Sequence, residues 1–420
     1  MTRKIKTRRK FIKSSLAGAS VVALAGCGSD GGDGGGDGSD GDGDGGSTPT
    51  ATVAASDEAQ QIVSELPDYY PSDYAEVVQG AMDEGSLTLY TGHFGTLSES
   101  YIETFTNRFS FIDVEVINLA SAQVFERFST EASQDVWEPD LVHSPDAVAL
   151  NRFKQLEILQ NYESPEEEHI RDGFKSDDGM VMAPDFMPYA HAWHPPEADD
   201  PPMTLPDIAE AVDSNPDRWE EKICMYDGVL STAMWQMMYL WSNHYGREEM
   251  EEYLRMIAPA QVQSFWSTST MGEWVATGEV DLGINLAEFI MAKYVRPDYG
   301  EDVLAWGPDE DIIFPAFYGG YVMPKEVSNP NAAKLFYDWW LSQEGQAFLA
   351  NEWKIASGRT DMGEVVESTY NIPNGDDVPL TYEGLTEITP SLLDYKELSQ
   401  AGAEKEEFKN LWYEIFVAGA

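Results

Sequence analysis

Short apolar runs rich in β-forming residues alternate with stretches of helical periodicity from residue 85 onward, and this alternation restricts the fold more than any other feature. A first series of β-type runs covers 86–91, 114–119, 140–144 and 180–185, and a second covers 222–227, 264–268, 282–286 and 303–307. Between them, apolar residues recur at the spacing of amphipathic helices. Such alternation is typical of an α/β fold, in which helices cover a sheet.

A proline-rich segment, 194–206, separates the two series. Proline has no backbone N–H and a fixed φ, so this segment can form neither a regular helix nor a central strand. The ordered part of the chain, about 360 residues, also exceeds what one hydrophobic core usually holds. We therefore expect two lobes.

Residues 1–26 have the plan of an export signal. Seven basic and no acidic side chains lie in the first 13 residues, and the next 13 are small or apolar, a run too short for a membrane span of ~20 residues. TRRKFIK at 7–13 resembles a twin-arginine export motif, and LAGC at 24–27 resembles a lipobox. The resemblance implies cleavage before Cys27, a lipid on its sulfur and anchoring to the outer face of the cell membrane. A plain signal peptide with an incidental cysteine is the alternative.

Residues 27–59 start with this cysteine and continue mainly as Gly, Asp, Ser, Thr and Ala. Such residues bury almost no apolar surface, so we expect a disordered linker. DGDGDG at 40–45 begins like a calcium loop, but Ala51 stands where the loop needs a glutamate. We interpret the segment as a spacer.

The chain carries a formal net charge of −48, and loss of the basic signal makes the mature part more acidic still. No Lys or Arg occurs from 14 to 107, which disfavours nucleic acid as a partner because phosphates need cations. Self-repulsion on this scale is relieved by salt, so we expect a halophilic source, an archaeon. Cys224 has no partner once Cys27 is lipidated, so no intrachain disulfide is expected.

Four segments carry a family resemblance when they are taken in order: 84–95 (EGSLTLYTGHFG), 138–166 (EPDLVHSPDAVALNRFKQLEILQNYESPE), 278–289 (GEVDLGINLAEF) and 328–350 (SNPNAAKLFYDWWLSQEGQAFLA). Together they resemble the solute-binding proteins of ATP-driven importers, in the branch that carries ferric iron, phosphonates, sugar phosphates, thiamine and polyamines. The resemblance implies an α/β, two-lobed, periplasmic-binding-protein-like fold of type II with a hinge between the lobes. Lobe 1 would comprise 60–185 and 314–420, and lobe 2 would comprise 186–313.

The same resemblance implies a function and partners. The protein would be a membrane-anchored, monomeric subunit that captures a small-molecule or metal solute between its lobes and delivers it to an ABC permease. No cofactor is implied. A secreted enzyme is the alternative from another class, but HExxH, GxSxG and phosphate-loop motifs are absent from the sequence, so we expect no catalysis.

Ligands of open α/β sheets bind outside the carboxyl ends of strands, where helix N-termini point free N–H groups. Residues that follow each expected strand are therefore candidates for ligand contact: Thr91, His93, Ser144, Asp185, Tyr189, Asp227, Ser231, Thr232, Ser269, Asn285 and Glu288. Ser, Thr, Asp and Asn are also ordinary N-cap residues. For each of these residues, capping without ligand contact stays open.

A metal solute is one of the open alternatives. His93, His143 and Glu288 would be its ligands, since imidazole and carboxylate both suit iron. Iron-binding relatives carry adjacent tyrosines just after the strand that here is followed by Ala287 and Glu288, so a ferric site would need non-standard ligands. The abundant acids and aromatic residues would equally suit an organic cation.

Overall fold

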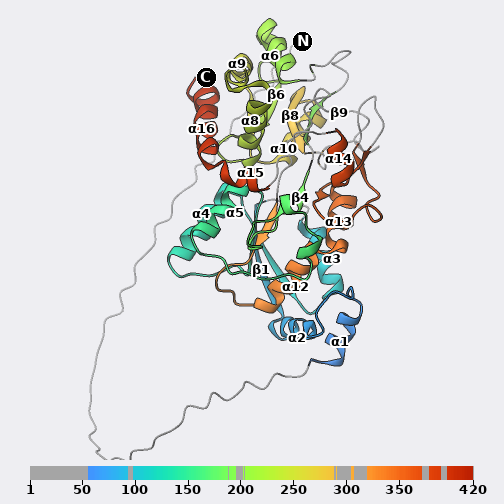
Figure 1. Ribbon diagram of the computed structural model, residues 1–420. Helices are drawn as coiled ribbons and strands as arrows, with labels where there is room; N and C mark the ends of the chain where they lie inside the picture. The colour runs from blue at the N-terminus through green and yellow to red at the C-terminus, as the bar shows by residue number, and fades with distance from the viewer. Residues whose placement is uncertain are drawn as a thin grey trace, which may run out of the picture. The chain divides into compact units, whose positions relative to one another are not determined.

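Two helix-covered β-sheets organise the part of the chain that the structure describes (Figure 1). The structure is a computed structural model, and it describes residues 55–92, 98–187, 189–194, 202, 204–287, 290, 304–306, 319–370, 378–388 and 395–419. The chain divides into two units, 1–53 and 54–420, and all described residues belong to the second. Within these residues, every helix falls short of the length and apolar character that a bilayer span requires.

The first sheet has four strands in the order β10-β3-β1-β2. The central strand β1 pairs in parallel with both β2 and β3, and β10 closes one edge by antiparallel pairing with β3. Its β1 and β3 residues are almost all buried, as expected for strands covered on both faces. The strands are β1 (Ser86–Thr91), β2 (Asp113–Asn118), β3 (Leu141–Ser144) and β10 (Gly320–Val322).

Helices cover this sheet on two sides of β1 (Figure 1). On one side α4 and α5 pack through Phe125, Phe128 and Phe153. On the other side Tyr101 of α3 lies against Phe336 and Trp339 of α12, and α2 packs along α12. These helices and the neighbouring ones are α1 (Asp57–Ser64), α2 (Tyr74–Glu84), α3 (Ser98–Arg108), α4 (Ser121–Ser133), α5 (Ala147–Gln155), α12 (Pro330–Leu341) and α13 (Gln343–Trp353).

The start of α12 is held by a carboxylate from another helix. Pro330 occupies its first turn, where the missing N–H of proline costs no hydrogen bond within the helix. Asn329 stands at the N-cap but its side chain donates to Asp140 instead of capping the helix. The carboxylate of Glu84, at the end of α2, accepts from the backbone N–H groups of Asn331 and Ala332 at 2.9 and 2.8 Å. This contact fixes α12 against α2.

The second sheet has five strands in the order β7-β6-β8-β5-β9. β6 pairs in parallel with β7 and β8, whereas β5 runs antiparallel to β8 and β9. The strands are β5 (Tyr189–Trp193), β6 (Ile223–Tyr226), β7 (Gln263–Phe265), β8 (Leu282–Ala287) and β9 (Leu304–Trp306), and the helices are α6 (Leu205–Ser214), α7 (Pro216–Trp219), α8 (Thr232–Tyr245), α9 (Arg247–Ile257) and α10 (Thr268–Thr277).

Smaller elements complete the chain. β4 (Asp185–Phe186) pairs with β11 (Ala356–Ser357) just before the chain enters the second sheet, and β12 (Thr369–Tyr370) pairs with β13 (Val378–Pro379). The remaining helices are α14 (Tyr382–Ile388), α15 (Tyr395–Gln400) and α16 (Gly402–Tyr413). Short 3₁₀ turns cover 167–169, 172–174 and 258–260, and a π-helical turn covers 414–418.

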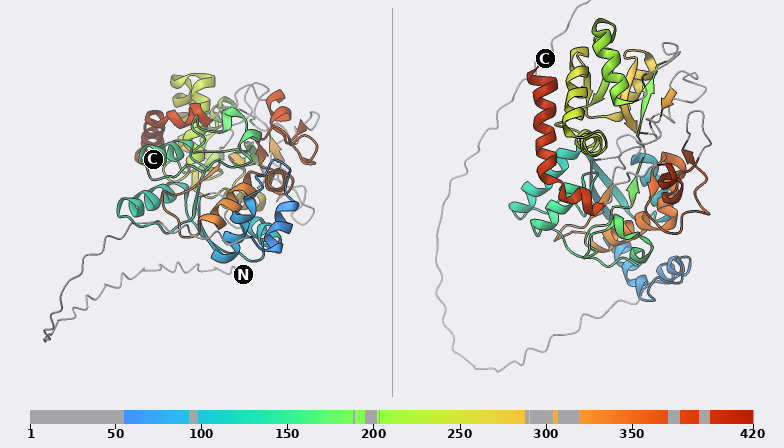
Figure 2. Two further views of the ribbon diagram at one scale, coloured as in Figure 1. Left: turned by 60° about the horizontal axis from the view of Figure 1, so that its bottom comes forward. Right: turned by 45° about the horizontal axis from the view of Figure 1, so that its top comes forward.

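The C-terminal helix lies against the helices of the second sheet (Figure 2, right). Phe408 of α16 packs on Tyr239 of α8, and Arg255 of α9 donates to Glu414 at 2.9 Å. The preceding helix, α15, packs on α5 of the first sheet instead, where Asn151 donates to the carbonyl of Ser399. The lobe boundaries derived from the sequence, which assign 314–420 to lobe 1, therefore stay a proposal.

The α/β alternation predicted from the sequence is confirmed for most elements, but one expected strand is mostly absent and several of the observed strands were not expected. Residues 180–184 were expected to form a strand with 185, but only Asp185–Phe186 does so, and Pro184 lacks the N–H that a ladder would need there. β5 and β10 were not expected as strands. Both are short, and β5 is buried along its whole length without alternation, so period-2 patterning does not reveal it.

Candidate functional site

The carboxyl ends of the two central parallel strands of the first sheet, β1 and β3, lie next to each other and adjoin helix α8 of the second sheet. Thr91, the last residue of β1, is in register with His143 on β3. A side chain at Gly92 would meet Pro145, so the two loops after these strands touch. The carbonyl of Pro145 accepts a hydrogen bond from Nε2 of Gln236 on α8 at 3.4 Å. The carboxyl edges of the two sheets therefore face each other here.

Ser144 and Asp146 use their side chains to shape the loop after β3. Oγ of Ser144 accepts from the N–H of Asp146 at 3.2 Å. Oδ1 of Asp146 in turn caps α5 by accepting from the N–H groups of Val148 and Ala149. The sequence left capping open as an alternative to ligand contact for Ser144, and the contacts show that this side chain does take part in a turn.

Lys405 reaches this same loop from α16. Its Nζ lies 2.5 Å from Oδ2 of Asp146 and 6.0 Å from the ring centre of Trp235 on α8. Asp146 is buried and Lys405 largely so. One cation thus contacts both the first sheet's α5 cap and the second sheet's α8.

On the second sheet, Asp227 folds the loop between β6 and α8. Its Oδ1 accepts from the N–H groups of Val229 and Leu230, both at 2.8 Å. Ser231 follows at the N-cap of α8, but its side chain makes no capping bond. Thr232 and Gln236, one helical turn apart, are both buried. Oγ1 of Thr232 and Oε1 of Gln236 have no hydrogen-bond partner among the described residues.

Asn285 has an unusual backbone and an unused side-chain acceptor. Its φ is +52°, in the left-handed region, although it lies inside β8, a conformation that stores strain and recurs at functional sites. Its N–H donates to Nδ1 of His191 at 3.1 Å. Burial lowers the pKa of His191 to about 4, so the ring is neutral and carries its proton on Nε2. Oδ1 of Asn285 is buried and has no partner in the described part of the chain.

Two other candidates lie deeper in the two sheets. Tyr189 on β5 is buried, pairs with Ala287 and lies edge-on to Tyr226, with ring centres 6.1 Å apart. His143 is buried on β3, with its ring edge-on to Tyr321 at 4.8 Å. Both fill space between strands, whatever else they contact.

Asp185 points into the first sheet's core. Its carboxylate accepts from Nε1 of Trp340 at 3.1 Å and from Nε2 of Gln346 at 2.9 Å. Burial raises its pKa to about 7, against the lowering effect of these two bonds. His143 lies nearby, since both residues border Gly319. These bonds give Asp185 a structural role that the sequence did not reveal.

Of the remaining candidates from the sequence, one lies on α10 and the others fall outside the described residues. Ser269 lies in the first turn of α10, where Ser267, not Ser269, is the N-cap and accepts from the N–H of Thr270. His93, Glu288 and Cys27 lie outside the described residues. Among the described residues, no three His, Cys, Asp or Glu side chains are grouped as a metal ion would require.

Gln236 and Lys405 are the site residues that sequence reasoning missed. Gln236 could have been found, because it lies four residues after Thr232 on a predicted helix and so shares its face. Lys405 could not, because its approach depends on how α16 packs.

Comparison with known proteins identifies the family. The family model described as bacterial extracellular solute-binding protein matches residues 100–373. The chain belongs to this family. The resemblance seen in the sequence is thereby confirmed, and the family is one of exported binding proteins, not enzymes. Elements of this solute-binding protein that lie outside the matched part are α1, α2, β1, β13, α14, α15 and α16. No curated protein sequence matches the chain significantly.

Solved structures share the fold of this solute-binding protein at low sequence identity. The substrate-binding protein of an ABC transporter from Agrobacterium tumefaciens is 16% identical with a TM-score of 0.68, over 81% of this chain and 96% of that one. AfuA from Actinobacillus pleuropneumoniae, with fructose-6-phosphate bound, is 19% identical with a TM-score of 0.63, over 79% and 98%. Iron-bound HitA from Pseudomonas aeruginosa is 18% identical with a TM-score of 0.61, over 79% and 99%. The chain thus has the two-lobed, type II periplasmic-binding-protein fold.

Proposed function

We propose that this solute-binding protein captures one small solute between the facing carboxyl edges of its two sheets and delivers it to the membrane permease of an ABC importer. The family and the fold support capture of a solute. Delivery to a permease is supported by the ABC-transporter protein among the structural neighbours. Closure of the two lobes about a hinge would trap the solute.

The observation that carries the proposal is a set of buried polar atoms left without partners within the described chain: Oγ1 of Thr232, Oε1 of Gln236 and Oδ1 of Asn285. A buried polar group without a hydrogen bond costs about 1–3 kcal/mol, and such groups are rare in native proteins. All three belong to elements that start or end at the carboxyl edge of the second sheet. A solute bound there would satisfy them.

The proposed contacts from the sequence fit around these three atoms. Thr91 and Ser144 would approach from the first sheet, and Tyr189, Asp227, Ser231 and Ser269 from the second. His93 and Glu288, which follow β1 and β8 in the sequence, are proposed as further contacts. Exported protein would be tethered by a lipid on Cys27, so that the solute is captured at the outer face of the membrane.

The proposal is tested on protein purified from its native source without exposure to denaturant. Native mass spectrometry, together with metal analysis, should detect one solute molecule or ion per chain. Incubation with an excess of that solute should leave its chemical structure unchanged. Chemical turnover of the solute, or a chain that captures nothing from cell extract or growth medium, would contradict the proposal.

A further inference from the structure

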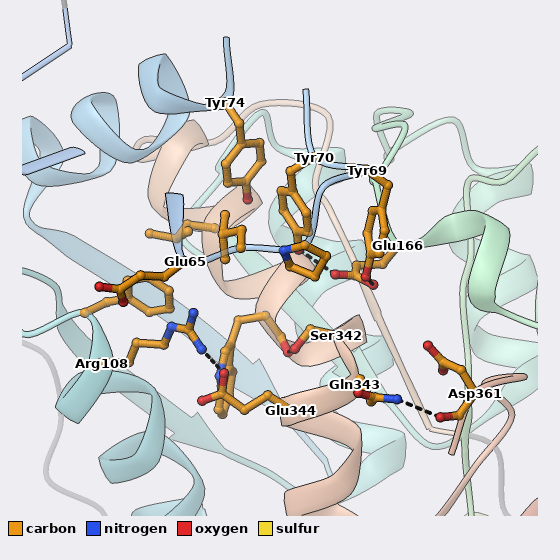
Figure 3. A pocket seen from close by; sticks show the side chains of 15 residues that line it. Glu65, Tyr69, Tyr70, Tyr74, Arg108, Glu166, Ser342, Gln343, Glu344 and Asp361 are labelled. Atoms are coloured by element: carbon orange, nitrogen blue, oxygen red, sulfur yellow. Dashed lines mark hydrogen bonds and ion pairs between the residues drawn. The ribbon is translucent and has the colours of Figure 1, made fainter. Parts of the chain in front are cut away.

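A second cavity, of about 390 Å³, opens between the segment that precedes α2, the end of α3 and the junction of α12 with α13 (Figure 3). None of its lining residues belongs to the solute site proposed above. Its volume lies in the range of small-molecule sites, ~300–1,000 Å³. Its walls include Tyr69, Tyr70, Tyr74, Phe109 and Trp339.

The three tyrosines are fixed in place by buried carboxylates. The hydroxyl groups of Tyr69 and Tyr70 donate to the two oxygens of Glu166 at 2.8 and 2.6 Å, and that of Tyr74 donates to Asp338 at 2.6 Å. The rings of Tyr69 and Tyr70 stack with their centres 5.4 Å apart, and Tyr70 meets Tyr74 edge-on at 4.8 Å. The aromatic wall is therefore preorganised.

These hydrogen bonds also set the chemistry of the wall. Burial and the Glu166 carboxylate raise the pKa values of Tyr69 and Tyr70, so both phenols stay neutral. A phenol whose O–H donates its hydrogen bond to a carboxylate can offer a ligand only the lone pairs of its oxygen. Its ring also becomes more electron-rich. Such a wall favours a cation over its ring faces and hydrogen-bond donors at its oxygens.

The charged side chains around the cavity also favour a cationic ligand. Glu65, Glu166, Glu344 and Asp361 line it. The single cationic side chain among the described lining residues, Arg108, is paired with Glu344. Arg359 lies behind the wall, held between Glu166 at 2.7 Å and Asp361 at 2.8 Å. No uncommitted cation among these residues awaits an anion, so phosphate or carboxylate ligands are disfavoured.

One buried donor in the wall lacks a partner. Trp339 is 4% exposed, and its indole Nε1 has no hydrogen-bond acceptor among the described residues. An unpaired buried donor is a costly feature that a ligand acceptor would remove. A hydroxyl on the ligand would serve.

We propose that this cavity is a second ligand site, which binds a small organic cation: a substituted ammonium group against the tyrosine wall, with a short hydroxyl-bearing arm toward Trp339. Choline has both features and is the probe for the test. The site is separate from the cleft between the sheets and does not depend on solute capture there.

The test is a calorimetric titration of the full-length protein with choline chloride, with potassium chloride adjusted to keep total chloride constant. Saturable binding with a Kd of roughly 0.1–10 mM is expected. The neutral carbon isostere of choline, in which a tert-butyl group replaces trimethylammonium, should bind at least about 5-fold more weakly, since it lacks the charge.

Variants localise the binding. Tyr69→Leu removes an exposed ring without cutting into the core and should weaken choline about 2- to 30-fold, whereas Tyr69→Phe keeps the ring and should retain most of the affinity. Two control variants should bind choline as the parent does: Tyr413→Leu, which removes another exposed tyrosine, on α16, and Gln236→Ala in the proposed solute site. Glu65→Gln removes an exposed negative charge at the rim of the cavity and should independently weaken choline binding.

Three results would overturn the proposal: no saturable binding up to ~50 mM choline, equal affinity for the neutral isostere, or loss of choline binding in Gln236→Ala but not in Tyr69→Leu. The last would place the cation in the cleft between the sheets. Thermal unfolding of each variant confirms that the compared proteins are folded.

Discussion

Some buried polar side chains of this molecule find hydrogen-bond partners within the chain, and others keep an atom without one. Asp185 accepts from both Trp340 and Gln346, and Asp338 accepts from Tyr74, Tyr162 and Ser164. Thr232 and Asn285, by contrast, each keep an atom without a partner in the described residues. We expect the first kind to govern stability and the second to govern affinity.

Asp185 makes stability depend on pH. Its pKa is about 7 in the folded protein, raised by burial from 3.8. At pH values between 3.8 and about 7, the carboxyl group is therefore protonated in the folded state and ionised in the unfolded chain. The free energy of unfolding should therefore fall as pH rises from about 4 to about 7. Asp185→Asn should make this decline shallower, even if it lowers stability at every pH. Urea unfolding at several pH values measures it.

Other buried groups also make the free energy of unfolding depend on pH, and they remain in the Asp185→Asn variant. The pKa of Asp338 is also raised to about 7 by burial and acts in the same direction, whereas the pKa of His191, lowered to about 4 by burial, acts in the opposite direction. The slope that remains in Asp185→Asn is the sum of these two effects. A decline equally steep in parent and variant would mean that Asp185 is ionised in the folded protein throughout.

The sequence alone could not separate these roles. Ser144, Asp227 and Asn285 all follow or end strands and were equally good candidates. Only the structure shows that the side chains of Ser144 and Asp227 accept hydrogen bonds from loop N–H groups. It also shows that Oδ1 of Asn285 accepts no hydrogen bond from the described residues. Caps and ligand contacts draw on the same residue types, so position after a strand predicts the neighbourhood of a site but not the role of each member.

Helix α16 contacts the helical layers of both sheets. Lys405 in its first half pairs with Asp146 in the loop after β3. Trp412 in its second half packs so closely on Gly228, which follows β6, that no side chain would fit at that position. Helices and strands with clear periodicity, such as α4, α8 and β1, could be predicted with their approximate bounds. The packing of α16 could not, because it depends on long-range contacts such as that of Lys405 with Asp146, which are 259 residues apart in sequence.

Lys405→Met tests the bridge made by α16. It leaves the buried carboxylate of Asp146 without its cation and should cost about 1–3 kcal/mol of unfolding free energy. Lys409→Met on the same helix is the matched control. Lys409 pairs only with Glu406 at the surface, 3.6 Å away, so its loss should change stability by less than about 0.5 kcal/mol. Equal effects in urea unfolding would show that Lys405 contributes no more than a surface charge.

On the scale of the whole molecule, the dominant feature is the net charge. A net charge of −48 implies repulsion that salt screens, with a Debye length of ~10 Å at 0.1 M and ~3 Å at 1 M. We predict that the melting temperature is higher in ~3 M than in ~0.1 M potassium chloride. Equal midpoints would show that the acidic surface does not destabilise the fold, and would remove the reason to expect a halophilic source.

The proposed lipid anchor is tested by Cys27→Ser. The variant should leave the membrane fraction because the acylated sulfur is gone. It should bind the solute with unchanged affinity, since the cysteine is the first residue of the expected linker 27–59 and is far in sequence from the proposed solute site. Variant protein that still sediments with membranes and is released only by detergent would contradict lipid attachment at this residue.

The measurement that most directly tests solute capture between the sheets pairs affinity with stability. Thr91→Val on the first sheet, and Thr232→Val and Asn285→Gly on the second, are compared with Ser267→Ala, which removes only the N-cap of α10. For each, the Kd of the solute identified by native mass spectrometry and the free energy of unfolding are measured. We predict a 5- to 150-fold loss of affinity in the first three, corresponding to ~1–3 kcal/mol, with stability nearly unchanged. Ser267→Ala should instead lose about 1 kcal/mol of stability and no affinity. Unchanged affinity in all three site variants, or losses of affinity that merely follow losses of stability, would contradict the account.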